Sequence, residues 1–284
     1  MANTIYDKII EKRDQMSKSQ IKIANYIIEN PDVAPFLTAS KLAKNVGVGE
    51  ATVIRFAVFL GYQGYPDFQW HLQEALKRKW TSAERFEKTT KDGNNSPDSV
   101  WEEVLRDDMQ NIRTTLENLD QEDFQAAVQA IIEAKRIYIV AYRSAQSIGL
   151  FLEFYLDLVL QNTELIRQAD GVSEHLLDMG KDDLVIALGF SRYTKRTVDI
   201  LNYVRTRGAK TLVITDHIMS PLAPLGDIQL FTSVDINSFI DSFVAPLSII
   251  NALITAVTRS EQEKVKTRLE QLEDLWESFN VFQE

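Results

Sequence analysis

The sequence predicts two domains of different class: an all-α domain at the N-terminus and a C-terminal α/β domain whose parallel sheet is flanked by helices. Two observations support this prediction. As far as Glu133 the apolar residues recur at helical spacing, whereas from Lys135 onward short apolar and β-branched runs alternate with helical patterns. The 284 residues are also enough to bury two separate cores.

The domain boundaries are placed where the composition changes. Residues 81–99 are polar and contain Gly93 and Pro97, which is typical of a linker. The predicted division is residues 1–80 for the helical domain, 81–120 for a linker and connecting helix, 121–260 for the α/β domain and 261–284 for a C-terminal helix.

Five helices are predicted in the N-terminal domain. A capping box formed by Ser17 and Gln20 marks the start of the second helix, and Asn30-Pro31 marks its end. The predicted helices are Thr4–Gln15, Ile21–Glu29, Ala39–Val46, Glu50–Leu60 and Pro66–Trp80.

The third and fourth helices have the spacing of a helix-turn-helix motif. Gly47 stands where the third helix must end in a left-handed conformation, which glycine adopts at little cost. The small side chain of Ala43 allows the two helices to cross closely. The spacing alone is equally compatible with an ordinary helical hairpin.

The fourth helix presents short or hydrogen-bonding side chains, as a helix that enters the major groove of DNA requires. A Gly- and Tyr-rich turn follows it and suits contact with a phosphate backbone. The candidate DNA-contacting residues are Lys44, Gly49, Glu50, Ala51, Thr52, Arg55, Tyr62, Gln63 and Tyr65.

The distribution of charge supports a nucleic-acid partner, although the net charge of −10 taken alone does not. Residues 1–80 carry 11 Lys+Arg against 8 Asp+Glu, and the remaining residues carry 20 against 33. A mildly basic head on an acidic body is typical of a DNA-reading domain attached to a soluble domain.

The composition also indicates the cellular compartment in which the protein is expected. The chain has no cysteine, which suits a reducing cytoplasm, and its N-terminus does not resemble a signal peptide. No apolar run is long enough to span a bilayer. We therefore expect a cytoplasmic protein without a membrane partner.

The connecting helix is predicted at Val100–Leu119 and carries a long apolar stripe. Packing between subunits and packing on its own chain explain such a stripe equally well. The residues of the stripe are Trp101, Val104, Leu105, Met109, Ile112 and Leu116.

The α/β domain follows a helix predicted at Glu122–Glu133. Continuous apolar strands that alternate with helices indicate a parallel sheet covered on both faces. The predicted strands are Arg136–Ala141, Thr163–Arg167, Asp183–Leu188, Lys210–Thr215 and Asp227–Thr232, and the predicted helices are Gln146–Leu160, a helix ending at Arg207, Ser238–Thr258 and Glu261–Phe279.

Hydroxyls and cations follow the carboxyl ends of the predicted strands, where ligands bind in such sheets. Helix N-termini at these positions favour an anion. The candidate ligand-binding residues are Arg143, Ser144, Ser191, Arg192, Tyr193, Thr194, Lys195, Thr215 and Ser220. For Ser144, Ser191 and Thr194 the alternative is plain N-capping. For Lys195 and Arg196 it is a solvated helix face.

The chain resembles the RpiR/MurR family of bacterial transcriptional regulators, in which a helix-turn-helix domain precedes a sugar isomerase (SIS) domain. The resemblance lies in Leu42-Ala43 with the run 47–56, in Leu60-Gly61-Tyr62, and in Ile214-Thr215-Asp216 with Ser220-Pro221. It implies a double-stranded DNA operator, a phosphosugar-like effector bound by the SIS domain, and a homodimer or homotetramer.

The chain departs from the family pattern at two glycines. Arg143 stands in the usual Gly-x-Gly-x-Ser loop, and Arg192 stands in the usual Ser-x-Ser-Gly-x-Thr loop. Either the effector is smaller or more acidic than a usual sugar phosphate, or the arginines fill the pocket and the domain is a ligand-independent scaffold. We favour the first reading, because Ser191, Thr194 and Thr215 are retained.

The rival function is a sugar-phosphate isomerase, which needs a base to move a proton between neighbouring carbons. Glu174 and His175 are the only adjacent Glu-His pair, and solvated surface residues explain them better. No GxxxxGK or GxGxxG loop is present. We therefore expect no enzyme activity, no catalytic residue, no metal and no cofactor.

Overall fold

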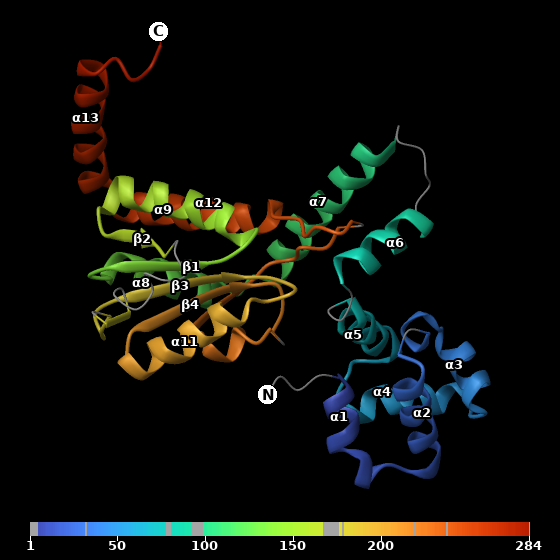
Figure 1. The fold of residues 1–284 in the computed structure, drawn as a ribbon. Helices are drawn as coiled ribbons and strands as arrows, with labels where there is room; N and C mark the ends of the chain where they lie inside the picture. Colours follow the sequence, from blue (N-terminus) through green and yellow to red (C-terminus); the bar gives the residue numbers. More distant parts are fainter. Residues whose placement is uncertain are drawn as a thin grey trace. The chain divides into compact units, whose positions relative to one another are not determined.

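The computed structural model describes residues 5–31, 33–77, 81–92, 99–166, 176–177, 179–218, 220–236 and 238–283. The chain divides into two compact units, Met1–Asn94 and Asn95–Glu284, each of which is described by itself (Figure 1). The division falls later than the expected boundary at residue 80, because the segment expected to be a linker contains a helix.

The first unit is all-helical, as predicted. Its helices are α1 Ile5–Glu11, α2 Lys18–Glu29, α3 Ala39–Val46, α4 Glu50–Phe59, α5 Tyr65–Lys77 and α6 Ser82–Asp92. The largest side chains of its core include Phe56 from α4, Phe68 from α5 and Ile23 and Ile27 from α2, all fully buried. The ring of Phe56 packs edge-on against Phe68, with centroids 5.8 Å apart. These contacts hold α4 against the rest of the unit.

The helix boundaries follow the capping signals in the sequence. Ser17 accepts a hydrogen bond from the N–H of Gln20, and the side chain of Gln20 accepts one from the N–H of Ser17, so the predicted capping box is present. Gly47 ends α3 with φ of 73°, in the left-handed conformation that the motif requires. The predicted turn between α3 and α4 is thus confirmed.

Helix α6 lies in the segment that the composition assigned to a polar linker. Its start is fixed by a reciprocal cap, in which the N–H of Thr81 donates to Glu84 Oε2 at 2.6 Å and the N–H of Glu84 donates to Thr81 Oγ1 at 3.3 Å. The hydrogen bonds from the backbone and hydroxyl of Thr81 lower the pKa of the Glu84 carboxyl. A capping box therefore starts a helix here despite the scarcity of apolar residues.

The second unit contains a five-stranded parallel sheet, as predicted. The strands are β1 Ile137–Ala141, β2 Thr163–Leu165, β3 Leu184–Gly189, β4 Lys210–Thr215 and β5 Ile228–Phe231, and their order in the sheet is β2-β1-β3-β4-β5. Every neighbouring pair is parallel. The residues of β1 and β3 are buried throughout, because helices cover both faces.

Among the helices whose bounds the structure describes, three pack against one face of the sheet and α11 Lys195–Arg207 packs against the other. The first group is α8 Gln121–Glu133, α9 Ala145–Leu160 and α12 Val244–Ser260, whose apolar side chains share a core with alternate residues of β1, β3 and β4. Helix α11 packs on the opposite face through Ile200, Leu201 and Val204. Helix α13 Gln262–Ser278 turns away from these layers (Figure 1).

Helix α7 Val100–Asn118 joins this unit through polar side chains. Asn111 and Thr115 are its buried residues. The amide of Asn111 donates to the carbonyl of Asp235 at 2.6 Å and accepts from the hydroxyl of Ser233 at 2.7 Å, and Thr115 Oγ1 accepts from the N–H of Ser233 at 2.9 Å. Asp108 Oδ1 accepts from the hydroxyl of Ser242 at 2.5 Å. The polar face of the helix is therefore the one fixed to the body of the unit.

The apolar stripe of α7 faces outward in this unit. Its exposed members range from 39% exposure for Ile112 to 74% for Leu116, and Val104 is half-buried. The sequence left open packing between subunits and packing on the same chain, and within the second unit the stripe does not pack on the rest of the unit.

None of the helices in the described part of the chain combines the length and the apolar content that a bilayer crossing requires.

We predict that Asn111→Ala destabilises the second unit by about 1–3 kcal/mol, because it removes three hydrogen bonds, which join the buried Asn111 side chain to the half-buried Ser233 hydroxyl and to the backbone of Asp235. Urea denaturation followed by circular dichroism measures the change. The matched control is Asn118→Ala in the same helix, whose exposed amide donates only to the carbonyl of Thr114. An equal effect of the two substitutions would contradict the role given to Asn111.

Candidate functional site

Helix α4 has one buried and one exposed face. Val53, Phe56 and Ala57 pack into the core, which leaves the opposite face of the helix in solvent. The exposed residues of α4 are Glu50, Ala51, Ile54, Arg55 and Val58. Ile54 and Val58 are 41% and 55% exposed, and neither was among the residues predicted from the sequence to contact DNA.

Two polar side chains of α4 form the centre of this surface. The guanidinium of Arg55 donates to Thr52 Oγ1 at 3.4 Å, with Arg55 exposed and Thr52 half-buried. Lys44 is exposed in the last turn of α3, and Gln63 is exposed in the turn after α4. Gly49 occupies the N-cap position of α4, where no side chain accepts a hydrogen bond from the first backbone N–H groups.

Tyr62 and Tyr65 belong to the core of the first unit, with 6% and 4% exposure. The hydroxyl of Tyr65 donates to the carbonyl of Leu37 at 2.6 Å, and the ring of Tyr62 packs edge-on against Phe68. Burial raises the pKa of each hydroxyl to about 12, with the nearby Asp67 charge adding to the effect at Tyr62. The expectation that their rings lie against a phosphate backbone disagrees with this burial.

In the second unit the register of the strands determines which loops meet at the edge of the sheet where a ligand is expected. Ala141 in β1 is level with Leu188 in β3, and Leu188 is level with Ile214 in β4. Because these neighbouring strands are parallel and end level, the loops that follow them begin side by side. The sequence-predicted cations and hydroxyls are therefore brought to one edge of the sheet.

Two arginines on this edge have a left-handed backbone. Arg143 has φ of 58° and Arg192 has φ of 65°, and both side chains are exposed. This conformation costs a residue other than glycine about 1–2 kcal/mol. Both stand where the resembled family has glycine, so the loops keep a glycine-type backbone while carrying an arginine side chain.

The hydroxyl groups of the edge have different roles. Thr194 caps α11, accepting from the N–H of Thr197 at 3.4 Å, so the N-cap alternative holds for this residue. Ser144 precedes α9 without a side-chain cap. Among the hydrogen bonds of the described residues none involves the hydroxyl of Ser144 or of half-buried Ser191, so both are open to an external partner.

Thr215 and Ser220 brace the turn after β4. Thr215 Oγ1 donates to the carbonyl of Gly189 at 2.7 Å and lies 2.9 Å from Ser220 Oγ, which accepts from the N–H of Leu222 at 3.1 Å. Both residues are buried, at 0% and 1% exposure. Their hydroxyls are therefore engaged inside the protein, and the expectation of direct ligand contact does not fit their position.

Two tyrosines line the same loops. The hydroxyl of Tyr193 donates a short hydrogen bond to Asp216, which joins the loops after β3 and β4. The guanidinium carbon of Arg196 lies 5.8 Å from the ring centre of Tyr142. Burial raises the pKa of the Tyr142 hydroxyl, although the Arg196 charge opposes the shift. The contact with Tyr142 gives Arg196 a partner in the loop after β1. Its neighbour Lys195 is exposed in the first turn of α11.

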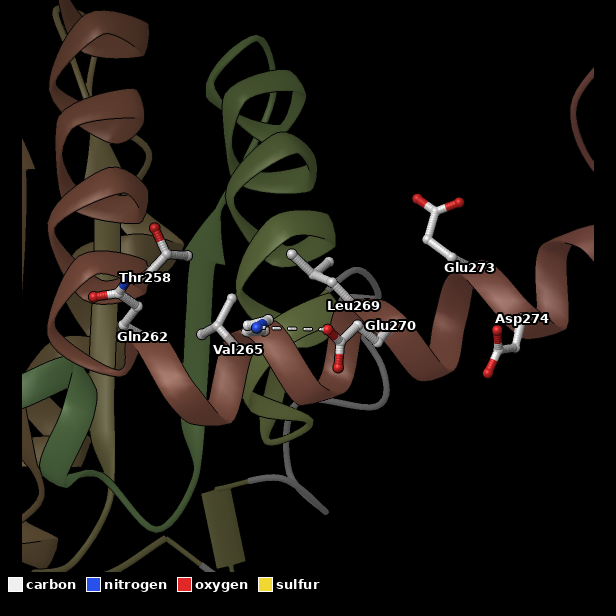
Figure 2. Close-up of a pocket in the computed structure, with 8 residues that line it drawn as sticks. Thr258, Gln262, Val265, Leu269, Glu270, Glu273 and Asp274 are labelled. Carbon is white, nitrogen blue, oxygen red and sulfur yellow. Dashed lines mark ion pairs between the residues drawn. The ribbon is translucent and has the colours of Figure 1, made fainter.

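A hollow of about 460 Å³ lies elsewhere in the second unit, along α12 and α13 (Figure 2). Figure 2 shows that Glu270, Glu273 and Asp274 bring three carboxylates to its rim, and Glu270 pairs with Lys266 at 3.8 Å. Its acidic rim does not suit an anion.

Two further expectations concern catalysis and metals. Glu174 and His175, the pair considered for proton transfer, lie outside the described residues. Within the part of the chain that the structure describes, no group of His, Asp and Glu side chains is arranged to hold a metal ion.

Comparison with known proteins identifies both units. Residues 3–79 match the family model of the rpiR-family helix-turn-helix domain, and residues 130–256 match that of the SIS domain. An uncharacterized HTH-type transcriptional regulator of Caldanaerobacter subterraneus is 27% identical over 280 residues, which are 92% of this chain and 93% of that protein.

Two further relatives cover most of the chain. The HTH-type transcriptional regulator HexR of Pseudomonas aeruginosa is 25% identical over 263 residues, which are 89% of each protein. The structure of the Vibrio vulnificus NanR protein complexed with ManNAc-6P has the same fold, with a TM-score of 0.60 and 18% identity over 99% of this chain and all of that one.

The curated relatives named here are HTH-type transcriptional regulators. The chain therefore belongs to the RpiR family of transcriptional regulators, which join a helix-turn-helix domain to a SIS domain.

Proposed function

We propose that this regulator binds a double-stranded DNA operator through α4 and that its SIS domain senses a small anionic metabolite, a sugar phosphate or a related carbohydrate acid. The observation that carries the proposal is the pair of left-handed arginines at the strand ends, which place two positive charges where the family has glycine. We place this activity in the cytoplasm, where a regulator meets DNA and phosphorylated metabolites.

The DNA-reading step uses the exposed face of α4. Arg55 supplies the donors that recognise guanine in the major groove, and its hydrogen bond with Thr52 limits the directions in which the guanidinium points. Ile54 and Val58 offer apolar contacts to thymine methyl groups. Lys44 and Gln63 flank this face and contact phosphates, and the backbone N–H groups after Gly49 point toward a third phosphate.

The effector-sensing step uses the edge formed by the loops after β1 and β3. The hydroxyls of Ser144 and Ser191 and the N-termini of α9 and α11 suit a phosphate group. The NanR structure, in which the same fold holds a phosphorylated sugar, supports this class of ligand. Arg143 and Arg192 add charge-assisted donors, which favours an effector more acidic than a neutral sugar monophosphate.

Left-handed arginines also argue against a vestigial site. Residues other than glycine keep a left-handed backbone only where the surrounding structure enforces it. Such residues concentrate at ligand-binding sites. Both side chains are exposed, whereas an arginine that had filled a pocket would be buried. We therefore assign Arg143, Ser144, Ser191 and Arg192 to effector contact, with Tyr193, Thr194 and Lys195 beside them and Thr215 and Ser220 as supports of the neighbouring turn.

Arg55→Ala is expected to weaken binding to the cognate operator by about 1–3 kcal/mol, because a bidentate contact to guanine is lost. Fluorescence anisotropy measures the affinity for fragments of the chain's own upstream region and for random DNA. Lys22→Ala, an exposed basic residue on α2, is the control. An equal loss on random DNA would show that Arg55 contacts only phosphate.

Replacing both left-handed arginines, as Arg143→Gly with Arg192→Gly, is expected to abolish most of the thermal stabilisation given by acidic phosphosugars while leaving the unliganded protein folded. Glycine accepts the observed backbone, so the loops keep their shape. A thermal-shift panel of phosphosugars and sugar acids measures the effect, with Lys181→Ala as the control. A stronger response of the double variant to the same ligands would show that the arginines block the site.

A further inference from the structure

Tyr142 and Arg196 lie beside the candidate effector site, and the proposed function gives neither of them a role. We infer that the hydroxyl of Tyr142 and the guanidinium of Arg196 form a second anion subsite, which binds a carboxylate of the effector. This inference rests on the proposed effector site and deepens it. It makes the effector a phosphorylated sugar acid rather than a phosphosugar without an acid group.

The strand pattern places Tyr142 on the side of the sheet that α11 covers. Side chains alternate along β1, and Tyr138 and Val140 pack in the same apolar cluster as Ile200 and Val204 of α11. Tyr142 follows Val140 by two residues and packs against this cluster as well. Its ring therefore lies at the carboxyl end of β1, on the face of the sheet where α11 packs.

The hydroxyl of Tyr142 is buried and has no hydrogen-bond partner among the residues that the structure describes. Such a group is uncommon in a folded protein, because it has lost its hydrogen bonds to water and gained none in return. Tyr193 in the loop after β3 shows the contrasting case, since its hydroxyl donates to Asp216. The Tyr142 hydroxyl is therefore a donor that remains available to a ligand.

Burial raises the pKa of the Tyr142 hydroxyl above its ordinary value, although the Arg196 charge opposes the shift. The hydroxyl therefore keeps its proton at neutral pH, and it can donate a hydrogen bond to an anion.

Arg196 adds a positive charge beside this donor. Its guanidinium carbon lies 5.8 Å from the centre of the Tyr142 ring. Among the ion pairs of the described residues none involves Arg196, so no carboxylate of this part of the chain neutralises its charge. Arg196 also stands in the first turn of α11, where a positive charge opposes the helix dipole. Both observations favour an anion supplied from outside the chain.

A carboxylate suits this pair of donors better than other groups of a sugar do. A guanidinium offers parallel N–H donors that match the two oxygens of a carboxylate, and the phenol adds one more donor. A second phosphate has three acceptor oxygens, which is more than these two side chains satisfy. The hydroxyls of Ser144 and Ser191 remain for the first phosphate, so the two acidic groups of one ligand have separate partners.

Matched pairs of ligands test the subsite in the full-length protein. Each pair consists of an aldose phosphate and the acid formed by oxidising its aldehyde: glucose 6-phosphate with 6-phosphogluconate, and glyceraldehyde 3-phosphate with 3-phosphoglycerate. Isothermal titration calorimetry should give about tenfold tighter binding of the acid than of the aldose phosphate, because the acid gains hydrogen bonds between charged groups.

Tyr142→Phe and Arg196→Gln should each remove most of this preference and leave the affinity for the aldose phosphates nearly unchanged. The control is Tyr203→Phe, which alters an exposed tyrosine of α11 and should keep the preference. An equal loss of affinity for both members of a pair would show that Tyr142 only shapes the loop, and it would overturn the inference.

The remaining outcomes separate this inference from the proposed function. A preference for the acid that survives in Tyr142→Phe would overturn the subsite and leave the proposed function in place. Failure of both acids to bind the wild type, while an aldose phosphate binds, would do the same. Failure of all these compounds to bind would count against the subsite and the proposed function together.

The unliganded protein gives an independent check. Because the Tyr142 hydroxyl has no partner to lose, Tyr142→Phe should leave the midpoint of thermal unfolding unchanged or raise it. Tyr193→Phe removes the hydrogen bond to Asp216 and should lower the midpoint. A midpoint lowered to the same extent by both substitutions would show that the Tyr142 hydroxyl supports the fold, contrary to the inference.

Discussion

The parallel register of β1, β3 and β4 is the constraint on which the candidate effector site depends. Ala141, Leu188 and Ile214 lie level, so three loops leave the sheet at one edge. Residues about 50 and 25 positions apart in sequence meet there only because the strands end together. The hydrogen bond from Thr215 to the carbonyl of Gly189 fixes two of these ends to each other. A shift in the register of one strand would separate the two left-handed arginines.

Much of the fold could be predicted from the sequence, because its signals are local. The capping box at Ser17 and the left-handed Gly47 are formed by residues within four positions of one another, and all five strands were recognised by their apolar runs. Helix α6 was not predicted, because its few apolar residues do not give a helical pattern. Its composition is that of a linker, and only the cap between Thr81 and Glu84 marks the start of a helix.

The candidate sites were harder to predict, because the role of a polar or aromatic residue depends on partners distant in sequence. Tyr65 appeared to be a surface residue of a Gly-rich turn, yet its hydroxyl binds the carbonyl of Leu37. Thr215 and Ser220 were found at the correct edge, but their hydroxyls bind each other and the backbone. In α7 the pattern revealed an apolar stripe without revealing that Asn111 would make the polar face the buried one.

The backbone at Arg143 and Arg192 has a consequence for how such a sensor changes over evolutionary time. Because each loop already follows a path that glycine accepts, one codon change at either position would remove a positive charge without forcing the loop to reorganise. Under the effector role proposed for these two arginines, ligand preference can change without a change in loop conformation. A lineage with this scaffold could then alter its effector in single steps, each of which leaves a folded intermediate for selection to act on.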